Sequence, residues 1–365
     1  MNLKELLGID LPIIQAPMAG AQGSALAIAV SNAGGLGSLP CAMLSPQAMR
    51  EELAAIRAGT RGAFNVNFFC HVQPADDAAR EAAWRARLAP YYAEFGVDPV
   101  TIPVAPARLP FSQAAADVLR EFRPPVVSFH FGLPADDLLA QVRTWGAKIL
   151  CSATTLDEAW ALQARGVDAV IAQGLEAGGH RGMFLSDDLD NQVGTLALVP
   201  QLVRALDVPV IAAGGIADAR GVAAARELGA AGVQVGTAYL LCPESTISAL
   251  HRAALKGEGA HHTTLTNLFT GRPARGLVNR FIRECGPMSA DAPAFPLAAA
   301  AVAPLRAAAE ARGNADFSPL WAGQNTTGCA EMPAAELTRA LAASLAAVAP
   351  EAIDPGHFHC GGPAL

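Results

Sequence analysis

The chain has 365 residues, of which 52% are hydrophobic and only 16% charged, so it has enough apolar side chains for a large core. Its net charge of −7 argues against nucleic acid or an anionic membrane surface as a partner. We expect no membrane span and no secretory segment, and the seven cysteines, odd in number and without a Cys-x-x-Cys pair, favour a reduced, cytoplasmic setting.

Short apolar runs alternate with helical segments along most of the chain. The runs predict strands at 11–16, 34–39, 63–69, 126–130, 147–152, 169–173, 208–213 and 232–236. The segments between them predict helices near 24–33, 46–58, 156–165, 195–205 and 218–228, with a long helical region from about 75 to 122. Eight such units in series predict an α/β fold of the (β/α)8 TIM-barrel type, with a doubly wound open sheet as the alternative.

Residues from about 240 to 310 interrupt this alternation, because they are rich in Gly, Pro and Arg and show little periodicity. We interpret 241–310 as a smaller, α-rich substrate or lid domain over the barrel mouth. The barrel then comprises 1–240 and is closed by 311–365, which includes an Ala/Leu helix from about 332 to 348. His357, His359 and Cys360 predict a disordered tail rather than a metal site, and we expect no metal elsewhere.

Polar and glycine residues gather where the predicted strands end, which is where TIM barrels place their chemistry. The first strand ends in Gln15, Ala16, Pro17 and Met18, the third carries Asn67, the fourth ends at His130, and the sixth ends at Gln173 before Gly178, Gly179 and His180. The seventh is followed by Gly214 and Gly215, and the eighth contains Gln234 and Val235 before Gly236 and Thr237.

These residues suggest a site for a phosphorylated, ring-bearing cofactor. Loops after the last two strands of such barrels often hold a phosphate, and the amides of Asn67 and Gln173 suit a ring edge with Met18 near one face, so FMN fits best. Each feature also has a simpler interpretation. Gly214-Gly215 is often only a turn, Asn67 can satisfy barrel backbone, and a lone His130 is often a core histidine. His180 gains nothing from packing on an exposed glycine loop, which favours a catalytic role near neutral pH.

Several segments together resemble nitronate monooxygenases, the family formerly called 2-nitropropane dioxygenases. They are 12–18, 31–37, 64–67, 176–182, 213–216 and 234–237, and the class I members of the family are matched further by 264–276, 279–281 and 320–324. The resemblance implies a barrel with a second domain, non-covalent FMN, and oxidation of a nitronate such as propionate 3-nitronate by O2, as in nitroalkane detoxification. We expect a monomer or homodimer that takes a small-molecule nitronate and O2 as substrates.

By position, the resemblance assigns flavin contacts to Asn67, Gln173, Gly178, Gly215 and 234–237, catalysis to His180, and a place along the substrate cavity to His130. We add Arg181 and Phe295 to the expected substrate lining. Class I members usually carry tyrosines and a lysine in the region matching 295–306, whereas this chain has Phe295 followed by an alanine-rich stretch. This departure leaves the preferred nitronate open. A carboxylated substrate needs a cationic partner, for which Arg181, Arg272, Arg275 and Arg306 are candidates.

Two other functions remain open from the sequence. The barrel motifs are shared with FMN-dependent reductases that use NAD(P)H to reduce a quinone or an enoyl-ACP. A non-catalytic barrel that binds a phosphorylated ligand is the third interpretation.

Overall fold

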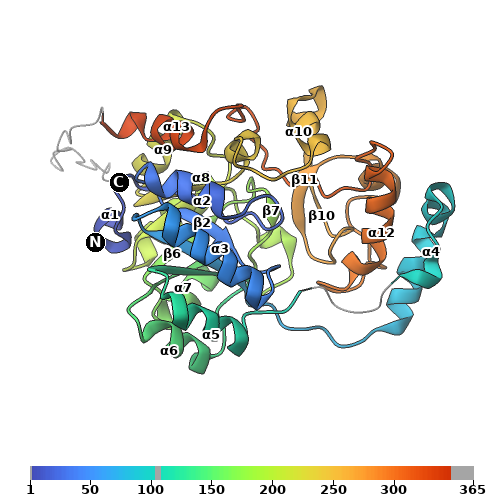
Figure 1. Ribbon diagram of the computed structural model, residues 1–365, viewed down its shortest axis with the longest axis horizontal. Coiled ribbons are helices and arrows are strands. Elements are labelled where there is room, and N and C mark those ends of the chain that lie inside the picture. The colour runs from blue at the N-terminus through green and yellow to red at the C-terminus, as the bar shows by residue number, and fades with distance from the viewer. Residues whose placement is uncertain (1, 103–107, 347–365) are drawn as a thin grey trace, which may run out of the picture.

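Eight parallel strands form a closed barrel in the computed structural model, which describes residues 2–102 and 108–346 (Figure 1). In spatial order they are β1 (Ile13–Gln15), β9 (Gly232–Val235), β8 (Val210–Ala213), β6 (Ala169–Gln173), β5 (Lys148–Ala153), β4 (Val126–His130), β3 (Phe64–Phe69) and β2 (Gly37–Pro40). The first and last strands are joined by a parallel bridge between Ile14 and Leu36, where the Gln15 N–H donates to the Leu36 carbonyl at 2.9 Å. The barrel expected from the sequence is therefore confirmed, and the open sheet is excluded.

Within the described residues, eight helices surround this barrel. They are α2 (Ser24–Asn32), α3 (Pro46–Gly59), α5 (Gln113–Phe122), α6 (Asp136–Arg143), α7 (Leu156–Ala164), α8 (Thr195–Ala205), α9 (Ala219–Glu227) and α13 (Ala334–Leu341). The last of them contacts α2 and α9, so the chain returns to complete the ring of helices. The short helix α1 (Leu3–Leu7) places its leucines in one apolar cluster with Ile14, Leu150 and Ile171.

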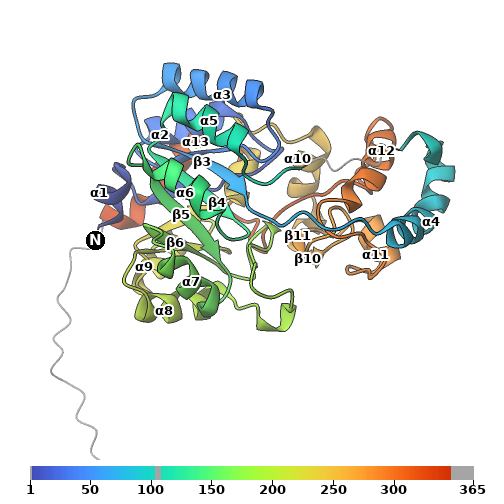
Figure 2. The same cartoon turned by 90° about the horizontal axis from the view of Figure 1, so that it is seen from below.

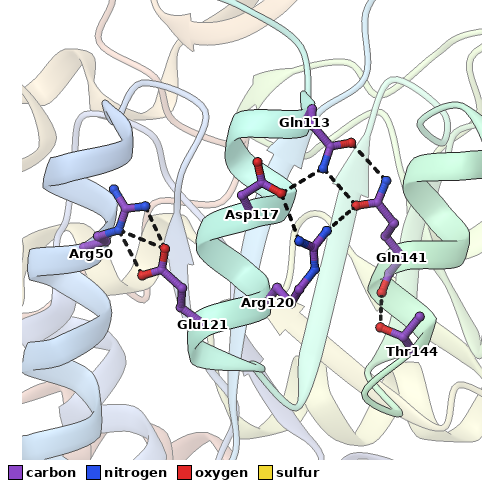
Figure 3. A network of polar contacts seen from close by, with 7 residues as sticks. All are labelled: Arg50, Gln113, Asp117, Arg120, Glu121, Gln141 and Thr144. Carbon is purple, nitrogen blue, oxygen red and sulfur yellow. Dashed lines mark hydrogen bonds and ion pairs between the residues drawn. The ribbon is translucent and has the colours of Figure 1, made fainter.

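Side-chain caps fix where several of these helices begin. Ser45, Thr155 and Asp218 each accept a hydrogen bond from a backbone N–H in the first turn of the helix that follows. On the outer surface, polar side chains connect α3, α5 and α6, including Arg50 with Glu121 at 2.7 Å (Figure 3). These contacts are exposed and contribute little to stability individually.

A second lobe extends from the carboxyl ends of the strands (Figures 1 and 2). It contains a three-stranded antiparallel sheet of β10 (Thr263–Thr266), β11 (Ala274–Leu277) and the two-residue strand β7 (Gly179–His180). Helices α10 (Ala249–Lys256), α11 (Arg280–Cys285) and α12 (Ala298–Glu310) also belong to the segment after the barrel. The short 3-10 helices are Pro99–Thr101, Leu189–Asn191, Thr237–Leu241, Glu258–His261 and Ala343–Ala346.

The region expected to be helical from about 75 to 122 is two helices with different destinations. Helix α4 (Ala78–Phe95) leaves the barrel and packs on α12 at the far edge of the second lobe, whereas α5 packs on the barrel helices α3 and α6 (Figures 1 and 2). Trp84, Leu88 and Tyr92 lie on one face of α4 at helical spacing and enter the core of the lobe. Part of the lobe thus comes from residues that our sequence division gave to the barrel.

The C-terminal helix is shorter than expected, because α13 ends at Leu341 and only a 3-10 turn follows within the described residues. The expected tail with His357, His359 and Cys360 lies outside the described residues. No helix in the described part of the chain is long and apolar enough to cross a membrane.

Candidate active site

A cavity of about 270 Å³ lies between the carboxyl ends of the barrel strands and the second lobe. Most of the residues selected from the sequence line it, namely Ala16, Pro17, Met18, Asn67, His130, Gln173, Gly178, Gly179, His180, Gly214, Gly215, Gln234, Gly236 and Thr237. They come from distant parts of the chain and meet because parallel strands end at the same edge of the barrel.

His180 lies on β7, where it is paired across the strand with Ala274 of β11. The segment after Gln173 is therefore not a free loop, since the second lobe holds it as an edge strand. The His180 Nε2 atom lies 2.9 Å from the Thr270 Oγ1 atom, and the Nδ1 atom has no hydrogen-bond partner among the described residues. Loss of hydration lowers the pKa of His180 well below its usual 6.5, and the charge of Arg108 is the next largest cause. The imidazole is neutral at pH 7.

Gln173 and His130 hold this segment from below. The Gln173 amide donates to the His180 carbonyl at 3.0 Å and accepts from the Gly182 N–H at 2.7 Å. His130 Nε2 lies 3.1 Å from the same carbonyl, and its Nδ1 lies 3.1 Å from Ser152 Oγ. Burial lowers the pKa of His130 to about 4. Both side chains line the cavity, but their polar atoms already serve to position β7.

Arg181 does not line the cavity, contrary to our expectation. Its side chain is fully buried and donates to the carbonyls of Gln173 and Gly174 at 2.8 and 2.7 Å and to Gln192 Oε1 at 3.0 Å. A buried guanidinium needs such acceptors for its N–H groups, so adjacent positions in the chain end in different surroundings. Arg181 connects the strand end to the loop that follows it.

Three further expected lining residues are placed behind the cavity wall. The Gln15 Oε1 atom accepts from the Ser38 N–H at 3.0 Å, and the Gln15 Nε2 group donates to Gln22 Oε1 at 2.5 Å. Val235 points outward into the core beneath the helices, because side chains alternate along a strand. Phe295 is buried beside the cavity, with its ring centroid 5.3 Å from that of His180.

The loops after β8 and β9 offer donors to an anion. Gly214 and Gly215 have φ of 123° and 71°, a region that favours glycine. Among the residues that the structure describes, the backbone N–H groups of Gly215, Gly236 and Thr237 have no acceptor. Glu176 lies behind these loops and accepts from the Thr195 N–H and hydroxyl at the start of α8.

Two amide side chains have free polar atoms in this cavity. The Gln234 Oε1 atom is buried without a hydrogen-bond partner in the described part of the chain. Asn67 uses its Nδ2 group on Ser128, with distances of 3.2 Å to the carbonyl and 2.9 Å to the hydroxyl, and its oxygen is left for a ligand.

The second lobe adds polar lining residues that sequence reasoning missed or left unranked. Arg108, His251, Glu310 and Trp321 were not selected, and Arg306 was one of four candidate cations. Arg272 and Arg275 do not line the cavity. No motif marks Arg108, which precedes a barrel helix and follows a lobe helix. Only the tertiary contacts bring it to this site.

Comparisons with known proteins give consistent results. Residues 1–344 match the family described as nitronate monooxygenase. The chain is 48% identical to a nitronate monooxygenase of Pseudomonas aeruginosa, covering 93% of this chain and 97% of that protein. It is 45% identical to one of Paraburkholderia phytofirmans, covering 93% of each.

Two solved structures are similar over nearly the whole chain. The first is nitroalkane oxidase from Streptomyces ansochromogenes, with a TM-score of 0.85, 41% identity, and coverage of 94% of this chain and 98% of that one. The second is FabK from Thermotoga maritima, with a TM-score of 0.71, 28% identity, and coverage of 94% and 96%.

Proposed function

The chain belongs to the nitronate monooxygenase family of oxidoreductases, and from this premise we propose that it binds FMN and uses O2 to oxidise alkyl nitronates, such as propionate 3-nitronate, to a carbonyl compound and nitrite. The observation that carries the proposal is the position of His180, a neutral imidazole facing a cavity that also has the unpaired donors of two glycine loops. For every two nitronates consumed, one O2 supplies one oxygen atom to each carbon, both C–N bonds break, and two nitrite ions leave.

The residues of the cavity fit FMN. The free N–H groups of Gly215, Gly236 and Thr237 suit the phosphate, because backbone donors at the ends of barrel strands bind such anions. The unpartnered Gln234 amide and the Asn67 oxygen suit the polar edge of the flavin ring. When bound there, FMN would supply the electron-transfer chemistry between the nitronate and O2.

His180 holds the nitronate by a hydrogen bond. Because its Nε2 atom is engaged by Thr270, the Nδ1 atom is the one left for the substrate. In the tautomer that carries its proton on Nδ1, Nε2 accepts from the Thr270 hydroxyl and Nδ1 donates to the nitronate oxygen. In the other tautomer, Nε2–H donates to the Thr270 hydroxyl, which donates to the Arg272 carbonyl at 3.4 Å. When a neutral nitroalkane is offered, the opposite tautomer lets Nδ1 act as base.

Aromatic side chains surround His180 and make this part of the cavity apolar. The ring centroids of Phe69, Phe131 and Trp321 lie 6.1, 6.0 and 5.6 Å from that of His180. A low dielectric strengthens the hydrogen bond to the substrate.

We also propose the cytoplasm as the compartment, because the cysteine count is odd, and a monomer or homodimer as the working state.

The test is His180→Asn. We expect the purified variant to retain FMN, since the phosphate loops are untouched, and to lose at least about 100-fold in kcat for propionate 3-nitronate, followed by O2 uptake and nitrite release. Unchanged kinetics would remove His180 from the mechanism. Anaerobic mixing with NADH or NADPH addresses the reductase alternative, because rapid bleaching of the flavin at micromolar reductant would contradict our proposal. Protein purified without flavin and inactive with nitronates would favour a ligand-binding role.

A further inference from the structure

We propose that Arg108 is the specificity-determining residue of this cavity, binding the carboxylate of a nitronate whose other end is held by His180. The proposal rests on the nitronate oxidation proposed above and adds the residue that selects a nitronate with a second anionic group.

Three arginines close to the site donate their side-chain N–H groups to other protein atoms. Arg181 donates to backbone carbonyls and Gln192. Arg275 donates to the Leu175 carbonyl at 2.9 Å and to Thr263 Oγ1 at 3.2 Å, and Arg272 donates to the Met183 carbonyl and stacks 4.3 Å from the centre of the Phe131 ring. None of the three lines the cavity.

Arg306 does line the cavity, but its charge is balanced. Its Nε atom forms an ion pair with Glu310 Oε1 at 2.7 Å, and the Ser318 hydroxyl donates to the same carboxylate at 2.6 Å. Both members of the pair face the cavity. An incoming carboxylate would be attracted by Arg306 and repelled by Glu310, so this pair offers it little net attraction.

Arg108 lines the cavity without a counter-ion among the described residues. Its guanidinium lies 5.7 Å from the centre of the Phe295 ring, an apolar neighbour that provides no acceptor for its N–H groups. Burial lowers the pKa of Arg108, and the charge of Arg306 lowers it further. An arginine in such surroundings is poorly solvated, and an anionic ligand with two oxygens would restore its hydrogen bonds.

Phe295 links this cation to the catalytic end of the cavity. Its ring contacts the His180 ring at 5.3 Å between centroids and lies beneath the Arg108 guanidinium. Arg108 is also the charge with the largest effect on the pKa of His180. Both groups therefore adjoin the same ring, and a short substrate with its nitronate at His180 and its carboxylate at Arg108 fits this arrangement.

A matched pair of substrates tests this assignment. Propionate 3-nitronate and propyl 1-nitronate have the same chain length and differ in a terminal carboxylate against a methyl group. In the flavin-loaded protein, we expect kcat/KM to favour the carboxylated substrate. Arg108→Met should lower kcat/KM for propionate 3-nitronate by about 10- to 100-fold, mainly through KM, and change that for propyl 1-nitronate less than about threefold. Arg108→Lys should recover part of the loss.

The control is Arg283→Ala, an exposed lobe arginine outside the cavity, which should leave both substrates unaffected. Equal losses for both substrates in Arg108→Met, or a wild type that does not discriminate, would overturn the proposal.

If the wild type oxidises neither nitronate, the proposed function fails, and the binding of a dicarboxylate tests the role of Arg108 separately. Succinate, titrated against the flavin absorbance, should then bind at least tenfold more weakly to Arg108→Met, and equal binding would overturn it.

NADPH tests whether Arg108 binds a phosphate group instead of a substrate carboxylate. Slower anaerobic flavin reduction by NADPH in Arg108→Met, with unchanged succinate binding, would assign the arginine to a phosphate group of NADPH and overturn the proposal.

Discussion

The Nε2 atom of His180 lies 2.9 Å from the Oγ1 atom of Thr270, a buried side chain in the turn between β10 and β11. The contact joins the cavity histidine to a part of the chain 90 residues away. It also leaves Nδ1 as the nitrogen for the substrate. The lobe therefore orients the imidazole as well as covering the cavity.

Replacing Thr270 with Val should remove this orientation while keeping the shape of the side chain. We expect kcat for propionate 3-nitronate to fall by about 10- to 100-fold, the loss of one buried hydrogen bond, with FMN content unchanged. Thr270→Ser keeps the hydroxyl and should retain most of the activity. A Val variant with wild-type kcat would show that Thr270 does not position the imidazole.

The buried histidines predict lower stability in acid. The pKa values of His71, His130 and His251 are lowered to about 4, in each case mainly by burial. Between pH 6.5 and 4 the unfolded chain binds these protons and the native chain does not, so the free energy of unfolding falls as the pH falls. Each histidine should contribute about 1–2 kcal/mol between pH 7 and 5.

His71→Phe tests one of these contributions. His71 is buried against Phe131 and Phe295, and its Nδ1 atom has no partner within the described residues. A phenyl ring keeps these ring contacts and gives up the 3.3 Å contact between His71 Nε2 and Gln73 Nε2. Urea unfolding at pH 7 and pH 5 should show a smaller pH effect in this variant. An unchanged difference between the two pH values would argue against His71 as a source.

Glu158 is a buried carboxylate that fixes the loop after β7. One oxygen accepts from the Phe184 and Leu185 N–H groups at 2.6 and 3.3 Å, and the other accepts from the Thr154 N–H and hydroxyl at 2.7 Å each. Glu158→Ala should destabilise the protein by roughly 3–5 kcal/mol, because several buried donors lose their acceptor. Asp157→Asn, at the exposed neighbouring position, is the control and should unfold like the wild type in a thermal scan.

Gly178 lies in the loop before β7, where it packs against Ala322 and Gly323 of the segment that follows α12. A Cβ atom there would stand 2.5 Å from the Gly323 nitrogen and 2.6 Å from the Ala322 carbonyl carbon. We expect Gly178→Ala to cost about 1–3 kcal/mol and to reduce the FMN bound after purification, measured by absorbance per protein. Gly259→Ala, where a Cβ meets nothing within 4 Å, should keep its full flavin content.

Local sequence signals were sufficient for the barrel and for one wall of the site. Apolar runs separated by helices predict the eight strands, and glycines or amides at their carboxyl ends, such as Gly215 and Gln234, predict the cofactor side of the cavity. These signals work because strand periodicity and turn chemistry depend on neighbouring residues. The helical content between 75 and 122 was recognised in the same way, but not that α4 would pack on α12.

Which arginine lines the cavity depends on tertiary structure alone. Arg181 was expected to line the cavity, yet its N–H groups donate to backbone carbonyls. Arg108 was not selected, and it lines the cavity without a carboxylate partner among the described residues. Sequence determined that this chain forms a glycine-lined barrel with a histidine at one strand end. Which cation meets a ligand depends on which buried donors already have acceptors, and those acceptors come from segments far apart in the chain.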